Sequence, residues 1–202
     1  GPPGFLATDA EARVAQLADY GLAAVGGFLV VLLHDPEHDP LPGVDAFLDE
    51  CVAARADVVV LAASTGLEGY DERPTLDDVG WRTLLANLDR LAEHAASRGM
   101  LAVIHPHIGT MVEDAGDVQR VIDGSHIGLC VDTGHLAAAG ADPVAIARAH
   151  PERVRHVHLK DVDAAMAAAV ADGSLAFGDA VRRGMFRPLG DGDVDIAGMV
   201  EV

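Results

Sequence analysis

Apolar and polar segments alternate along the chain in a pattern that predicts short strands separated by helices. Five runs are apolar at nearly every position and are bounded by Gly, Pro, Asp or His residues. Continuous apolar runs of this length are typical of strands that are buried on both faces. The predicted strands cover residues 22–33, 57–63, 100–104, 127–131 and 154–158.

The segments between these runs carry apolar residues at helical spacing and end at recognisable stop signals. Thr8 or Asp9 is a suitable cap for the first helix, Gly21 and Gly99 follow two of the helices, and Pro143 opens another. The predicted helices cover residues 8–20, 42–55, 78–98, 114–122, 143–150 and 164–171, and a last one begins at 194. Strands that alternate with helices predict a parallel sheet with helical crossovers.

An open doubly wound sheet and a closed (β/α)8 barrel both fit this order of elements. The chain has no G-x-G-x-x-G segment after a predicted strand and no P-loop, which disfavours a nucleotide-binding open sheet. Polar clusters follow at least three successive strands, as expected where all the strand ends of a barrel build one site. We therefore predict one α/β barrel domain over residues 1–202, a fragment lacking roughly the first two strands and the last.

The amino-acid composition limits the classes of partner that the protein is expected to bind. Half of the 202 residues are apolar, which is enough for one sizeable core, and the formal net charge is −18. A surface with this much negative charge repels phosphate backbones and anionic lipid. We therefore expect neither nucleic acid nor a membrane as a partner. Cys51 and Cys130 lie in apolar stretches and are interpreted as small core residues of a cytoplasmic protein.

Asp132 ends the fourth predicted strand and is followed by Thr133-Gly134-His135. A buried carboxylate needs a partner, and a hard oxygen donor at a strand end is suited to a divalent metal. The simpler interpretation is a helix N-cap, a position that Asp also favours. We favour the metal ligand, because His158 ends the next strand.

His156 and His158 alternate along the fifth strand, so their side chains share one face. We expect His158 to bind metal, and His156 either to assist it or to be an ordinary core or surface histidine. Lys160 is the only lysine of the chain. It is a candidate to stabilise developing negative charge on a substrate oxygen, and the alternative is a simple ion pair.

His105 and His107 form a second pair on one face, with Pro106 between them. Either is a candidate metal ligand or hydrogen-bond partner of a substrate hydroxyl, and the alternative is a solvated loop. His135 is a candidate general acid or base. Tyr70 and Arg73, in the loop after the second strand, are candidates to cover the site. The Gly190–Asp193 segment is interpreted as a flexible acidic turn rather than a calcium loop.

These residues resemble the xylose-isomerase-like barrel superfamily of sugar isomerases, epimerases and inositol-catabolic enzymes, and within it most of all the inosose dehydratases. The likeness spans nearly the whole chain and is densest from His105 to Asp195. The motifs that carry it are His105-Pro106-His107-Ile108-Gly109-Thr110, Val131-Asp132-Thr133-Gly134-His135-Leu136, His156-Val157-His158-Leu159-Lys160-Asp161-Val162, and Gly184-Met185-Phe186 followed by Pro188-Leu189-Gly190-Asp191-Gly192.

The resemblance implies a TIM barrel with Asp132 and His158 as metal ligands and His105 where most members carry a glutamate. A second family glutamate would lie beyond Val202. The implied reaction is metal-dependent loss of water from 2-keto-myo-inositol (inosose), with Mn²⁺ or Co²⁺ as the metal. His135 and Lys160 would be catalytic, and His107, His156 and Lys160 would hold oxygens of this polyol or keto-sugar substrate. Glutathione is associated with the activity, although no feature of this chain indicates a site for it.

Three alternatives remain at this point. A ketose isomerase or epimerase on the same barrel would need a carboxylate at the position of His105. A metal-dependent endonuclease for abasic DNA sites would need a basic groove, which the net charge of −18 disfavours. The third is a degenerate barrel without activity. An open barrel edge also predicts weak stability or self-association into a homo-oligomer.

Overall fold

The computed structural model of the protein describes residues 6–70 and 72–202. A parallel sheet of five strands has the spatial order β1-β2-β3-β4-β5. Its strands are β1 (Gly26–Leu32), β2 (Val58–Ser64), β3 (Leu101–Ile104), β4 (Gly128–Asp132) and β5 (Val154–His158). The order in space equals the order in sequence, as in a β/α barrel, whereas a doubly wound sheet reverses direction at a switch point.

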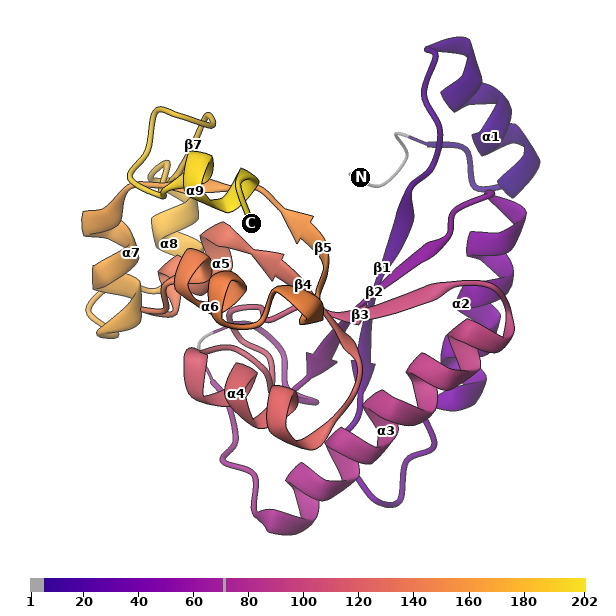
Figure 1. The fold of residues 1–202 in the computed structure, drawn as a ribbon, viewed down its shortest axis with the longest axis horizontal. Coiled ribbons are helices and arrows are strands. Elements are labelled where there is room, and N and C mark those ends of the chain that lie inside the picture. The colour runs from indigo at the N-terminus through magenta and orange to yellow at the C-terminus, as the bar shows by residue number, and fades with distance from the viewer. Residues whose placement is uncertain (1–5, 71) are drawn as a thin grey trace.

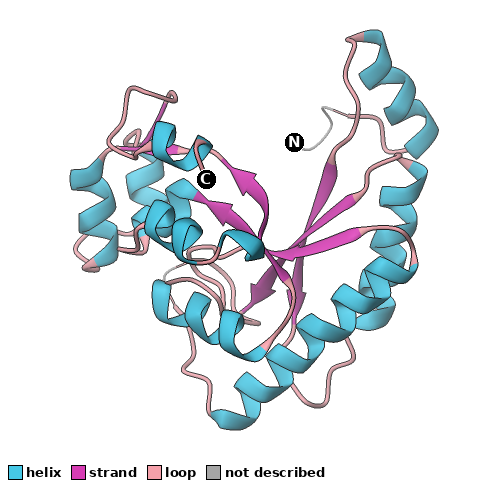
Figure 2. Ribbon diagram, in the orientation of Figure 1, coloured by secondary structure: helices cyan, strands magenta, loops and turns pink. Residues whose placement is uncertain are grey.

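Helices connect consecutive strands and cover the outer side of the sheet (Figures 1 and 2). The two longest, α2 and α3, lie along the β1–β3 part, and the later helices gather around β4 and β5. The helices are α1 (Ala10–Asp19), α2 (Leu41–Ala53), α3 (Asp78–Ser97), α4 (Ala115–Gly124), α5 (Thr133–Ala138), α6 (Pro143–Ala149), the 3₁₀ turn η1 (Pro151–Arg153), α7 (Ala164–Ala171), α8 (Phe177–Arg182) and α9 (Ile196–Val200).

The predicted strands and main helices are confirmed, with ends that shift by a few residues. The sequence pattern missed five short elements: α5, η1, α8 and the antiparallel pair β6 (Asp161–Val162) and β7 (Phe186–Arg187). Two-residue strands carry no periodicity that a pattern could reveal. Helix α5 starts directly from β4, capped by the last residue of that strand, so no polar loop announces it.

The prediction of a buried first strand over residues 22–33 is wrong in two respects. The strand begins only at Gly26, and its residues alternate between exposed and partly buried. Phe28 is 48% exposed and Val30 is 55% exposed, on the face that points toward the inside of the barrel. Within the described residues β1 pairs with β2 alone, so the other edge of this strand has no strand partner.

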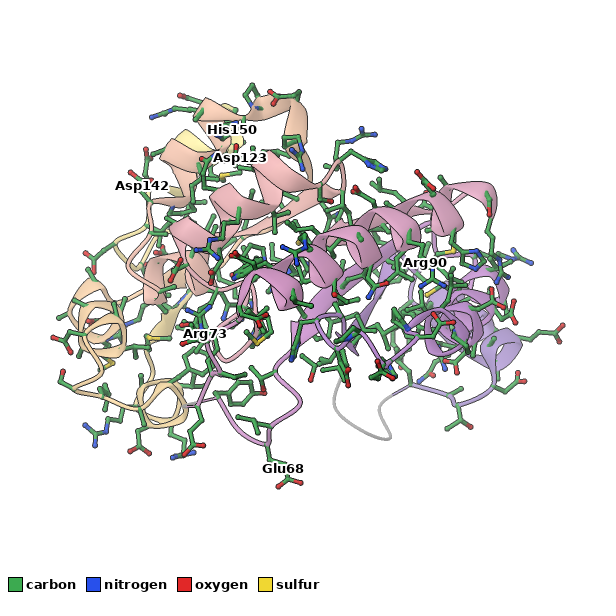
Figure 3. The ribbon with its side chains drawn as sticks, turned by 90° about the horizontal axis from the view of Figure 1, so that it is seen from below. Glu68, Arg73, Arg90, Asp123, Asp142 and His150 are labelled. Carbon is green, nitrogen blue, oxygen red and sulfur yellow. The ribbon has the colours of Figure 1, made fainter. Side chains whose placement is uncertain are left out.

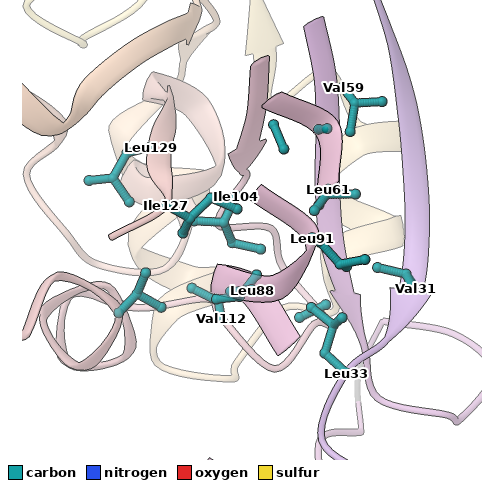
Figure 4. Packing of buried hydrophobic residues seen from close by; sticks show 14 of the residues in the cluster. Val31, Leu33, Val59, Leu61, Leu88, Leu91, Ile104, Val112, Ile127 and Leu129 are labelled. Carbon is teal, nitrogen blue, oxygen red and sulfur yellow. The ribbon is translucent and has the colours of Figure 1, made fainter. Parts of the chain in front are cut away.

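The main core lies between the outer face of the sheet and the helices. Leu88 and Leu91 of α3 pack in one cluster with Leu61 of β2 and Ile104 of β3 (Figure 4). These residues are at most 1% exposed. A second, smaller layer lies on the inner face, where Val60, Val103 and Cys130 pack together. Helix packing outside and small side chains inside hold the strand ends rigidly in place.

The acidic 190–193 segment is not the flexible turn that we predicted. The carboxylate of Asp161 accepts hydrogen bonds from the backbone N–H groups of Gly190 (2.9 Å), Gly192 (3.0 Å) and Val194 (3.0 Å). Asp161 is 1% exposed, and these N–H groups lower its pKa by hydrogen bonding to the charged form, against the effect of desolvation. The loop is thereby fastened to the residue that follows Lys160.

No helix within residues 6–70 and 72–202 combines the length and the apolar character needed to cross a membrane.

Candidate metal and active site

The sheet register brings the polar strand ends together. Asp132 of β4 lies opposite His158 of β5, and Cys130 lies opposite His156 one step deeper. His105 directly follows β3, the neighbour of β4 on its other side. Because residues two apart on a strand share a face, Cys130 and Asp132 both point to the inside, as do His156 and His158.

Asp132 uses its two carboxylate oxygens for different tasks. Its Oδ1 atom caps α5 by accepting the backbone N–H groups of Gly134 (3.1 Å) and His135 (2.9 Å). Its Oδ2 atom lies 3.1 Å from Nε2 of His105, 3.4 Å from Nδ1 of His158 and 2.7 Å from Nζ of Lys160. Of the two alternatives considered from the sequence, the N-cap is confirmed, and the metal ligand stays a prediction that concerns Oδ2.

The carboxylate of Asp132 is ionised although its side chain is fully buried. Desolvation opposes the charge, but hydrogen bonds from His105 and His158, and the charge of Lys160, outweigh it and lower the pKa of Asp132 well below its usual range. The ammonium group of Lys160 thus balances the charge of this buried carboxylate.

His107 and His135 form a tilted stack beside this carboxylate, with ring centroids 3.7 Å apart and ring planes inclined by 35°. Burial lowers the pKa of His107 to about 4. Burial, reinforced by the charge that His107 would carry, lowers the pKa of His135 to about 2. Both rings are therefore neutral near neutral pH, so each offers one donor and one acceptor nitrogen.

Lys160 is held by Thr133, a residue that the sequence analysis did not single out. The Thr133 hydroxyl donates to the backbone carbonyl of Lys160 (2.6 Å) and accepts the backbone N–H of the same residue (2.8 Å). Gly134 makes room for the lysine, since a Cβ added to it would lie 2.7 Å from Cβ of Lys160. In the sequence, the only signal for this role of Thr133 was its position directly after the strand-terminal Asp132.

The two residues predicted to cover the site, Tyr70 and Arg73, make different contacts in the structure. The Tyr70 ring lies 5.8 Å from that of His107, and its backbone crosses Gly109, where an added Cβ would come within 2.6 Å of Tyr70 Cα. Arg73 instead binds Asp117 and Asp114 at the start of α4, and Glu68 projects outward from the same loop (Figure 3). Tyr70 therefore covers the site, whereas Arg73 anchors the loop.

A pocket of about 270 Å³ opens beside His107. Its walls include Phe28, Thr65, Tyr70 and Thr110. The ring of Phe28 lies 5.7 Å from that of His105, so the pocket adjoins the carboxylate cluster. The lining of the pocket combines the apolar side chains of Val30, Ala62 and Leu67 with the hydroxyl-bearing residues Ser64, Thr65 and Thr110.

Two overlapping groups of side chains could hold a metal ion, and neither contains all three predicted ligands, Asp132, His158 and His105. His105, Asp132 and His135 each offer one donor atom within 4.8 Å of the others, and a second group joins His105 and His158 with Cys130. The Nδ1 atoms of His105 and His135 are buried and lack a hydrogen-bond partner. Buried imidazole nitrogens of this kind suit metal coordination, because an unpaired buried polar atom is otherwise costly. His158 belongs to the second group, with His105 and Cys130. Its Nδ1 atom also lies 3.4 Å from Oδ2 of Asp132.

The model of the family described as "Xylose isomerase-like TIM barrel" matches residues 2–202. The chain belongs to this family. The confirmed fold class and the resemblance stated above both agree with this membership.

The similar proteins include a rhizopine catabolism protein and inosose dehydratases. The rhizopine catabolism protein MocC of Rhizobium meliloti is 40% identical over 151 residues, which are 70% of this chain and 46% of that protein. An inosose dehydratase of Geobacillus thermodenitrificans is 36% identical over 135 residues, 65% of this chain and 45% of that enzyme. The chain spans about half the length of these relatives.

A solved structure with the same fold is the probable 3-DHS dehydratase AsbF from Bacillus anthracis. It superposes with a TM-score of 0.70 at 15% sequence identity, over 96% of this chain and 72% of that one. At this identity the likeness concerns the fold alone.

Proposed function

We propose that this barrel catalyses the dehydration of 2-keto-myo-inositol to a trihydroxycyclohexane dione, as a metal-dependent hydro-lyase. The observation that carries the proposal is the meeting of Asp132 Oδ2 with nitrogens of His105, His158 and Lys160 at adjoining strand ends. The names of the relatives that are 36% to 40% identical support the choice of substrate.

The roles of the residues follow from their positions. A divalent metal held by Asp132, His158 and His105 would polarise the ketone oxygen and acidify the neighbouring C–H bond. Lys160, whose side chain is 36% exposed, reaches the same point from the solvent side and donates to the oxygen on which charge develops. His107 beside the pocket and His156 one step deeper hold hydroxyl groups.

In the proposed reaction, His135 transfers one of the two protons. Elimination of water removes a proton from carbon and delivers a proton to the departing hydroxyl. The His135 ring is 4% exposed, stacks on His107 and has an unpartnered Nδ1 atom. The unpartnered Nδ1 atom is the position at which His135 would exchange this proton.

The proposal includes Mn²⁺ or Co²⁺ as the metal and a small keto-polyol as the partner, with glutathione as a further component by family resemblance alone. A cytoplasmic location belongs to it as well, because the free thiols of Cys51 and Cys130 suit a reducing compartment. Self-association through the open edge of β1 is also part of the proposal.

A ketose isomerase or epimerase is the second candidate. That chemistry commonly shuttles a proton between two faces of a carbon and is best served by two opposed carboxylates. Among the described residues, the two candidate metal groups contain a single carboxylate, that of Asp132. The dehydratase is the first choice because His105 stands where the alternative would need a carboxylate.

The test is turnover of inosose after chelation and reloading with Mn²⁺ or Co²⁺, followed through the ultraviolet absorbance of the dione. Asp132→Asn should abolish metal binding and turnover. Asp142→Asn is the matched control, since Asp142 (Figure 3) also caps a helix through Oδ1, here from Val144 and Ala145, but is exposed. Metal binding without inosose turnover would replace this proposal with the ketose reaction, to be checked on a panel of ketoses.

A further inference from the structure

We infer that Cys130 is a metal ligand, which gives the site a sulfur donor and a preference for thiophilic cations such as Zn²⁺ and Co²⁺ over Mn²⁺. The inference rests on the proposed metal site and extends its donor set. It is carried by the second donor group, in which Cys130 Sγ and one ring nitrogen each of His105 and His158 all lie within 4.8 Å of one another.

The local structure aims Cys130 at the histidines. It is two residues before Asp132 on β4, so both side chains point to the inner face, and it lies opposite His156 in the register with β5. The imidazole of His105, which is 1% exposed and has an unpartnered Nδ1, belongs to both donor groups. His105 therefore stands between an oxygen donor, Asp132, and a sulfur donor, Cys130.

The ordinary role of Cys130 is that of a small residue in the inner layer with Val60 and Val103. Alanine or valine would serve that role equally well, and neither would offer a donor atom beside two imidazoles. Two imidazoles and one thiolate form a donor set that selects Zn²⁺ or Co²⁺, whereas Mn²⁺ prefers oxygen ligands. On binding, the thiol releases its proton to solvent as the sulfur–metal bond forms.

Cobalt spectroscopy tests this directly, because a thiolate bound to Co²⁺ adds an intense near-ultraviolet charge-transfer band to the weaker visible bands of the ion. We expect this band in the wild type and in Cys51→Ser, and its loss in Cys130→Ser. Cys51 is the matched control, being the other cysteine of the chain and also buried. The affinity for Zn²⁺, measured by competition with Co²⁺, should fall at least roughly tenfold in Cys130→Ser.

The outcomes separate this inference from the proposed function. Visible Co²⁺ bands without the near-ultraviolet band in the wild type would overturn the role of Cys130 and leave the metal site intact. No uptake of Co²⁺ by the wild type would overturn both. Cys130→Ala provides a second variant, with folding checked by circular dichroism, because alanine suits the apolar layer of Val60 and Val103.

Discussion

Lys160 Nζ lies 2.7 Å from Asp132 Oδ2, so the only lysine of the chain neutralises the carboxylate that also faces His105 and His158. A metal at this carboxylate and the ammonium group compete for the same oxygen. In the proposed function, metal binding would release Lys160 toward a substrate oxygen.

The competition predicts the effect of Lys160→Met. A partly exposed ion pair contributes on the order of 1 kcal/mol, so its removal should raise the affinity for Mn²⁺ or Co²⁺ roughly fivefold, while turnover is lost. Isothermal titration calorimetry measures the first effect. Arg187→Met is the control, since Arg187 pairs with Asp163 outside the cluster. A lower metal affinity in Lys160→Met would show that the lysine assists binding instead.

The hydrogen bonds of Asp161 predict the effect of Asp161→Asn. The amide keeps one acceptor oxygen where the carboxylate serves the N–H groups of Gly190, Gly192 and Val194, so we expect a loss of about 1–3 kcal/mol in the free energy of unfolding. Chemical denaturation measures it. Asp191→Asn, an exposed acid of the same loop, should change little; an equal loss there would point to overall charge as the cause.

The contribution of Asp161 to the free energy of unfolding depends on pH in a defined way. Because the pKa of Asp161 is lowered in the folded protein, its ionisation stabilises the fold above the unfolded pKa, roughly 4. This contribution is lost as the pH falls through the lowered folded pKa. The stability difference between the wild type and Asp161→Asn should therefore be full at neutral pH and shrink in acid. A difference that stays constant down to the acid transition would contradict the assignment.

The close packing around Gly134 predicts that Gly134→Ala lowers the stability of the fold. The new Cβ would lie 2.7 Å from Cβ of Lys160 and 2.9 Å from Cε1 of Phe186, so something must shift, at a cost of about 1–3 kcal/mol. Thermal unfolding should show a lower Tm. Gly43→Ala is the control, because Gly43 lies in α2 with no atom within 4 Å of an added Cβ, and alanine should be neutral or stabilising there.

The open edge of β1 predicts self-association of the chain. Val30 is 55% exposed on the inner face of this strand, and Val30→Lys should shift the protein toward the monomer in analytical ultracentrifugation. Val52→Lys replaces a valine that is 48% exposed on α2 and serves as the control. A wild type that is monomeric at every concentration, or an equal effect of both variants, would show that β1 is not the contact.

Local pattern was sufficient for much of the architecture. Continuous apolar runs identified the five strands, and helical spacing with Gly, Asp and Pro signals identified the main helices, because these signals depend on neighbours in sequence. The alternation of side chains along a strand also placed His156 with His158 on one face. The polar residues after the strands marked one end of the barrel as the site, since the carboxyl ends of parallel strands share an edge.

Only the tertiary structure decided how these residues divide their work. The pairing of Lys160 with Asp132, the stack of His107 on His135 and the approach of Cys130 to His105 all join residues on different elements. They depend on strand order and register, which act through space and leave no local periodicity. The exposure of β1 and the ordering of the 190–193 loop by Asp161 were hidden for the same reason: burial and hydrogen bonding are set by which distant segment lies alongside.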